Sequence, residues 1–200
     1  MEFNMTEYEQ VYGKNANGVE ARDVYKNAEN NKLRFCLMGK LGDIRSVAST
    51  NNEKERDDLI GNFGKTSGKT SGQVLQSENW SIGVNDAWVL GGIECGATFY
   101  FVKEGGVNSI DDIYIDTNNA EHPISVTARE IIGLQCFKYV PKAINEGKTK
   151  IIAFVPPRDI GNSNNISFKK YDNEVKNFLE NNKTETVKQI INRYLWEVFK

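Results

Sequence analysis

The stretch from residue 80 to residue 102 constrains the fold more than any other part of the chain. A short apolar run over 80–84 is typical of a strand, and Asn85, which follows it, suits the N-cap of a helix. Gly96 is the residue type expected just after the end of that helix. The next run, Ala97–Val102, is rich in the aromatic residues that strands favour. The order strand, helix, glycine, strand predicts a β–α–β unit.

A second stretch predicts a similar unit. Ile110–Ile115 alternates well enough for a strand, and Thr127 with Glu130 has the spacing of a helix capping box. The helix that begins there should continue to about Phe137. A short apolar run, Ile151–Val155, is then ended by two prolines, which is typical of a buried strand.

The C-terminal part of the chain predicts two helices. The first is expected around Asp172–Leu179. In the second, apolar residues recur at helical spacing and form one continuous face: Val187, Ile190, Ile191, Tyr194, Leu195, Val198 and Phe199. Such a face more often packs on the protein's own sheet than on a partner, so we expect this helix to cover the core.

Together these elements predict one α/β domain over residues 1–200, with a mixed or mostly parallel sheet, flanking helices and a C-terminal helical pair. An α+β architecture is the alternative. Two segments are expected to be mobile, the N-terminus at about 1–18 and a loop at about 61–73 in which Gly, Ser and Lys repeat. The GKT triplets of this loop do not fit a P-loop, because Leu59 and Phe63 stand where that motif needs its first glycine.

The composition excludes several classes of protein. The chain has 25 Lys and Arg against 27 Asp and Glu, without the basic surplus of proteins that neutralise phosphate backbones, so nucleic acid is not an expected partner. Its one histidine and its three cysteines lie far apart in the sequence, which argues against structural zinc, and no residue is assigned to a metal. No cofactor is indicated either.

The sequence carries no recognisable membrane or targeting segment. No apolar run reaches the roughly 20 residues needed to cross a bilayer, and the first ten residues lack the basic and apolar regions of a signal peptide. An odd number of widely spaced cysteines suits a reducing compartment. We therefore expect a cytoplasmic location, which includes delivery into a target cell without a conventional signal peptide.

The residues expected to carry function are the polar side chains near the ends of the predicted strands, because open α/β sheets bind ligands beyond the carboxyl ends of their strands. An acid–base role is predicted for Glu104, Asp116 and His122, histidine being the side chain that titrates near neutral pH. Substrate binding is predicted for Asn85, Asp86, Arg129 and Arg158. Arg129 would stand in the first turn of a helix, where anions bind. For each residue taken singly, a role in a turn is the alternative.

Three other chemistries match the sequence in part. A magnesium-dependent nuclease could use the aspartates within 111–116 together with the EGK sequence at 146–148, although the glycine indicates a turn. A cysteine could pair with His122 as a nucleophile. The segment that begins at Arg45 (RSVAST) has the arginine and the Ser-Thr pair of ADP-ribosyl transferases, but no E-x-E motif lies far enough downstream.

The region 80–139 contains the sequences VNDAWVLGGI at 84–93, TFYF at 98–101 and VTAREI at 126–131. Through these sequences it resembles C-terminal toxin and effector domains of bacterial polymorphic toxin systems, and the resemblance covers about sixty of the 200 residues. It implies an effector or toxin that acts inside another cell. No catalytic set of that group matches this chain.

These observations lead to one functional hypothesis and one alternative. The hypothesis is a small bacterial effector- or toxin-type enzyme that acts on a nucleotide-like or otherwise phosphorylated substrate in a cytosol. The alternative is a non-enzymatic binding protein, such as an immunity or adaptor protein. The first expects a small-molecule or nucleotide-like ligand, and the second expects a cognate protein partner.

Overall fold

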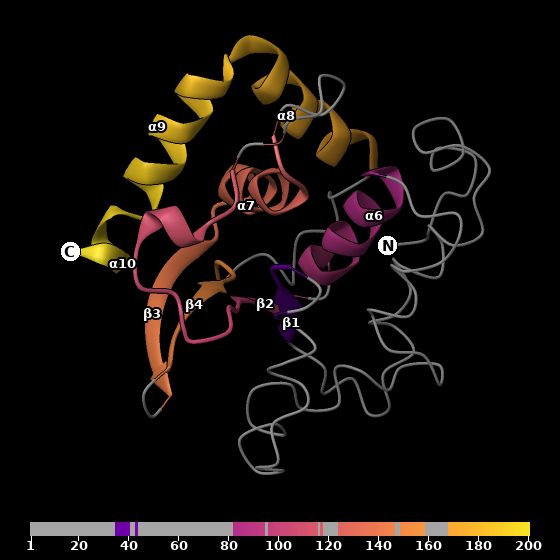
Figure 1. Cartoon of the computed structure of the whole chain (residues 1–200). Coiled ribbons are helices and arrows are strands. Elements are labelled where there is room, and N and C mark those ends of the chain that lie inside the picture. The colour runs from indigo at the N-terminus through magenta and orange to yellow at the C-terminus, as the bar shows by residue number, and fades with distance from the viewer. Residues whose placement is uncertain are drawn as a thin grey trace, which may run out of the picture.

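The structure is a computed structural model that describes residues 35–40, 43, 82–94, 96–115, 117, 124–146, 149–158 and 168–200 (Figure 1). The two segments expected to be mobile, 1–18 and 61–73, lie outside these ranges, and so do Asp116 and His122. The described part consists of helices and one small sheet, which confirms the expected mixture of α and β structure.

The sheet of the described part has four strands in the order β1 (Phe35–Met38), β2 (Thr98–Phe101), β4 (Thr149–Val155) and β3 (Val140–Glu146). β1 runs parallel to β2, whereas β2 and β4, and β4 and β3, are antiparallel. The expectation of a mixed sheet is confirmed, and that of a mostly parallel sheet is wrong. Only two residues separate β3 from β4, and so short a connection joins antiparallel strands only.

The segment expected as a strand at Ile110–Ile115 is not one. Ile110–Asp112 forms a short 3-10 helix instead. The carboxylate of Asp112 accepts the backbone N–H groups of Asn108 at 2.6 Å and of Ser109 at 3.0 Å. Such bonds from a side chain to its neighbouring backbone stabilise a local turn at the expense of a strand.

Helix α6 (Ile82–Glu94) ends where the sequence predicts and begins earlier. Gly96 adopts a positive φ of 65°, and the N–H groups of Gly96 and Ala97 bond to the carbonyls of Ile93 and Gly92, which is the Schellman ending of a helix. At the other end the helix already includes 82–84, so that run is no strand and Asn85 is no N-cap. A short apolar run does not by itself distinguish a buried helix from a strand.

Helix α7 (Val126–Cys136) is capped by Ser125, two residues before the predicted cap at Thr127. The Ser125 hydroxyl accepts the N–H of Ala128 at 3.0 Å. Thr127 therefore lies inside the first turn, and Glu130 lies in the helix proper, where it is buried, and not at the position that completes a capping box.

The predicted C-terminal helical pair is confirmed. It consists of α8 (Phe168–Asn181) and α9 (Thr184–Tyr194), followed by the short α10 (Trp196–Phe199). The apolar face enters the protein's own core, as expected, through Val187, Ile191, Leu195 and Val198. Figure 1 shows α8 and α9 arching over α7, with the sheet beyond α7. No helix of the described ranges is long and apolar enough to cross a membrane.

Aromatic rings connect the helices to the sheet. Trp88 of α6 meets Phe99 of β2 edge-on, with ring centroids 5.8 Å apart, and Phe99 meets Tyr139 in the same way at 5.7 Å. The Tyr139 hydroxyl donates to the Ala97 carbonyl at 3.0 Å. This buried cluster fixes α6 against the strand that follows it, which sets the position of the end of β2.

Gly133 allows α8 to lie close against α7. A Cβ atom at this position would stand 2.5 Å from the Tyr171 hydroxyl oxygen, and Tyr171 is buried. We expect Gly133→Ala to lower the free energy of unfolding, because an overpacking cost of about 1–3 kcal/mol exceeds the gain of about 1 kcal/mol in helix propensity. Urea unfolding followed by circular dichroism measures the change. Tyr171→Phe should recover part of the loss in the double variant, and a Gly133→Ala protein as stable as the wild type would contradict the tight contact.

Candidate functional site

A buried polar network joins α6 to α7. The Arg129 guanidinium holds the Asp86 carboxylate with two nitrogens: Nε lies 2.9 Å from Oδ1 and 3.1 Å from Oδ2, and Nη2 lies 2.8 Å from Oδ2. Asp86 is buried, and the Arg129 side chain is 17% exposed. This two-pronged geometry is the strongest form of an arginine–carboxylate pair.

The second link of this network joins Asn85 to Glu130. The Asn85 side-chain nitrogen donates to Glu130 Oε1 at 2.9 Å, and both residues are buried. Burial raises the pKa of Glu130 to about 7, the hydrogen bond from Asn85 opposes this, and the negative charge of Asp86 adds to it. Glu130 is therefore a group that titrates near neutral pH, a property that the sequence analysis assigns only to His122.

Three of the four predicted substrate-binding residues, Asn85, Asp86 and Arg129, thus belong to one network, although Arg129 and Asp86 are 43 residues apart in the sequence. The pairs Asp86–Arg129 and Asn85–Glu130 both join α6 to α7, so the network fixes one helix against the other. Ligand binding by Asn85, Asp86 and Arg129 stays a prediction. Glu130 is not predicted as a site residue from the sequence, because its spacing from Thr127 suggests a helix capping box.

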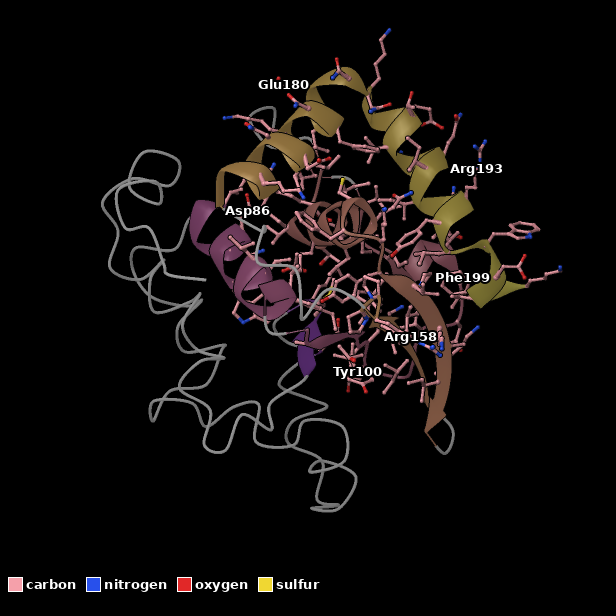
Figure 2. The ribbon with its side chains drawn as sticks, turned by 180° about the vertical axis from the view of Figure 1, so that it is seen from behind. Asp86, Tyr100, Arg158, Glu180, Arg193 and Phe199 are labelled. Atoms are coloured by element: carbon pink, nitrogen blue, oxygen red, sulfur yellow. The ribbon has the colours of Figure 1, made fainter. Side chains whose placement is uncertain are left out.

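The fourth predicted binder, Arg158, lies elsewhere. β4 runs antiparallel to β2, with Phe154 opposite Phe99 and Ile152 opposite Phe101, so the chain after β4 lies toward the amino end of β2. Arg158 is exposed there, and Figure 2 shows it well apart from Asp86. The prediction that all strand-end residues gather at one edge presumes parallel strands, and the antiparallel β4 removes Arg158 from that edge.

A cavity of about 250 Å³ lies at the carboxyl ends of β1 and β2, the parallel pair of the sheet. Phe101, the last residue of β2, lines it, and so do polar side chains from three segments: Lys40, Asp43, Lys103, Asp111, Asp112 and Tyr114. Thr127 adds the first turn of α7 to the lining. The end of a parallel strand pair is the place where open α/β sheets bind their ligands.

Hydrogen bonds fix the walls of this cavity. Lys103 forms an ion pair with Asp112. This bond, together with the backbone N–H groups of Asn108 and Ser109, holds the pKa of Asp112 below its usual value. Asp43 Oδ1 accepts the backbone N–H of Glu104 at 3.0 Å. The carboxylates of Asp43 and Asp112 thus hold the turn that follows β2.

Two charged side chains of the lining are less constrained. The Lys40 ammonium lies 4.6 Å from the centre of the Tyr114 ring, a cation–π contact. Asp111 is exposed, and no hydrogen bond between described residues holds its side chain. These two groups can turn toward a ligand without breaking an ion pair of the described part of the chain.

The predicted acid–base residues relate to this cavity in different ways. Glu104 is exposed in the turn beside Lys103. Asp116 and His122 belong to the segment between Ile115, which lines the cavity, and Ser125. The Ser125 N–H bonds to the Ile115 carbonyl at 2.8 Å, and its hydroxyl donates to the Tyr114 carbonyl. Ser125 therefore lies next to Ile115, a residue of the cavity lining.

The described residues bear on two of the other chemistries, a metal site and a nucleophilic cysteine. Within those ranges no group of three or more His, Cys, Asp or Glu side chains could hold a metal ion. Burial, with a smaller contribution from the charge of Glu174, raises the pKa of the Cys136 thiol to about 11. Cys136 is therefore protonated at neutral pH and is a poor nucleophile.

Comparison with known proteins adds no relative on which to base the assignment. No protein-family model, no curated protein and no solved structure matched the chain.

Proposed function

We propose that the protein is a small effector- or toxin-type enzyme that acts on a nucleotide-like or otherwise phosphorylated substrate in a cytosol. The observation that supports this is the cavity at the carboxyl ends of β1 and β2, where two lysines, three aspartates and the first turn of α7 share one lining. The bacterial and toxin part of the proposal rests on the sequence resemblance over 80–139.

In this proposal Lys40 and Lys103 attract the phosphate. An ammonium group carries three donors, so Lys103 can keep its bond to Asp112 and still contact an anion. Thr127 stands in the first turn of α7, where free backbone N–H groups and the helix dipole favour negative charge. The binding side of the cavity thus combines two point charges with a helix N-terminus.

The acid–base chemistry would come from the turn after β2 and from the segment after Ile115. Glu104 is held near the cavity through the bond of its backbone N–H to Asp43. Asp116 follows Ile115 directly, and His122 precedes the anchored Ser125 by three residues. A carboxylate or an imidazole here could take or give a proton at an ester oxygen next to the bound phosphate.

The first test is ligand binding. In a thermal-shift screen of nucleotides and sugar phosphates, at least one compound is expected to raise the melting temperature. Lys40→Ala should weaken its binding at least tenfold, or about 1.4 kcal/mol, because a charged contact to the phosphate is lost. Lys142→Ala, an exposed lysine of β3, is the control and should bind normally. A screen in which no phosphorylated compound raises the melting temperature would contradict the proposal.

The alternative, a non-enzymatic immunity or adaptor protein, is favoured by a different surface. Trp196 of α10 is 63% exposed and Val140 of β3 is 51% exposed, and the two elements pack against each other. Exposed tryptophan is enriched at protein interfaces. Alanine variants distinguish the two functions. An enzyme should lose activity in Glu104→Ala or His122→Ala without a lower melting temperature. A binding protein should keep its function in those two variants, and Trp196→Ala should no longer pull down its partner.

A further inference from the structure

We infer that the ligand of this cavity is a ribonucleoside monophosphate, with its sugar and phosphate inside the cavity and its base outside on the Tyr114 ring. The inference rests on the proposed function and names the substrate class. Three features of the cavity carry it: its size, the exposure of Tyr114 and the excess of carboxylates in its lining.

The size of the cavity limits what it can enclose. Sites that surround a drug-sized ligand usually measure about 300–1,000 Å³, and this cavity measures about 250 Å³. A ligand as large as a whole nucleotide would therefore extend beyond it. In the inferred arrangement the sugar phosphate part lies inside and the base lies at the mouth of the cavity.

Tyr114 supplies a surface for the base. It lines the cavity and is still 47% exposed, so its ring reaches from the lining to the solvent. Any of the bases can stack on an aromatic ring, because each base has a flat π face. The Lys40 ammonium lies over one face of the ring, 4.6 Å from its centre, so the base would stack on the opposite face.

The carboxylates of the lining explain why a phosphate alone is not the ligand. Three aspartates outnumber two lysines, and one of the lysines is paired with Asp112. The lining therefore carries one net negative charge, so phosphate alone gains little from it, whereas a sugar also brings hydroxyl donors. A carboxylate that accepts ribose hydroxyls is a common device in nucleotide sites. Asp111, which no described residue holds by a hydrogen bond, is the side chain that suits this role, so ribose should be preferred to 2′-deoxyribose.

Isothermal titration calorimetry on the full chain tests the inference with four probes: AMP, dAMP, ribose 5-phosphate and inorganic phosphate. We expect AMP to bind about tenfold more tightly than ribose 5-phosphate, which lacks the base. dAMP should bind about fivefold more weakly than AMP, and inorganic phosphate should bind most weakly. Asp111→Asn should reduce the difference between AMP and dAMP.

Variants of Tyr114 separate base stacking from an indirect effect through Lys40. Tyr114→Ala should weaken the binding of AMP to the affinity of ribose 5-phosphate and leave the affinity for ribose 5-phosphate unchanged. Tyr114→Phe should retain AMP binding. Equal losses for both ligands, or equal wild-type affinities for AMP and ribose 5-phosphate, would overturn the inference and leave the proposed function standing. If no phosphorylated probe binds, both fail.

Discussion

Asp86→Ala is expected to lower the free energy of unfolding by about 3–5 kcal/mol, the usual cost of removing one partner from a buried ion pair. The variant would leave the Arg129 guanidinium between α6 and α7 without the carboxylate that now takes three of its hydrogen bonds. Because the Arg129 side chain is 17% exposed, water can reach it in part, and the loss should fall near the lower end of that range. Urea unfolding at pH 7, followed by circular dichroism, measures it.

The control for this prediction is an exposed ion pair on the same chain. Glu197 and Lys200 lie 3.9 Å apart with both side chains largely exposed, and Glu197→Ala should change the free energy of unfolding by no more than about 0.5 kcal/mol. The double variant Asp86→Ala/Arg129→Met should be more stable than Asp86→Ala alone, because it removes the buried charge as well. If Asp86→Ala costs no more than Glu197→Ala, the network does not hold the two helices together.

The features that the sequence predicts correctly are those specified by neighbouring residues. The end of α6 depends on Gly96, a residue that adopts the required positive φ at no steric cost, and the structure shows it at 65°. The C-terminal helices depend on a continuous apolar face, and the burial of Val187, Ile191 and Leu195 follows from it. In both cases the signal lies within a few residues of the structure that it specifies.

The features that the sequence does not predict depend on partners far along the chain. β3 contains Pro141, Lys142 and Asn145, which are poor strand formers, and its strand conformation comes from pairing with β4. The antiparallel direction of β4 relative to β2 belongs to the pairing of those two strands, and no local pattern reports it. The helix starts are also misplaced by the sequence, because Asn85 and Thr127 are plausible caps, whereas α6 begins at Ile82 and α7 begins after Ser125.

The candidate site also has features that can be predicted from the sequence and features that cannot. Asn85, Asp86 and Arg129 can be selected from the sequence as polar residues near element ends. The pairing of Asp86 with Arg129 and of Asn85 with Glu130 cannot be predicted from it. Lys40, Lys103 and Tyr114 are ordinary surface residue types in the sequence. Only the parallel pairing of β1 with β2, across about sixty residues, brings Lys40 to the cavity that Lys103 lines.

Glu130→Gln is expected to stabilise the protein relative to the wild type by an amount that grows with pH. The pKa of Glu130 is about 7 in the folded chain and 4.5 under ordinary conditions. Below pH 4.5 the carboxyl of Glu130 is protonated in both the folded and the unfolded chain, and its ionisation does not lower the stability. Between pH 4.5 and 7 the unfolded chain releases the proton while the folded chain keeps it, so the stability of the wild type falls by about 3 kcal/mol as pH rises, and above pH 7 it stays at the lower value.

Glutamine isolates this effect because its side-chain oxygen can still accept the hydrogen bond from Asn85 and carries no proton to lose. Urea unfolding of both proteins at pH 5 and pH 8 should show the advantage of Glu130→Gln growing by about 2–3 kcal/mol. Glu180→Gln, an exposed position of α8 that Figure 2 shows on the outer side of the helix, should show no such growth. An advantage that is the same at both pH values would mean that Glu130 ionises as an ordinary carboxyl. The network then would carry two negative charges against one arginine at neutral pH, and its stability would have to come from contacts other than these.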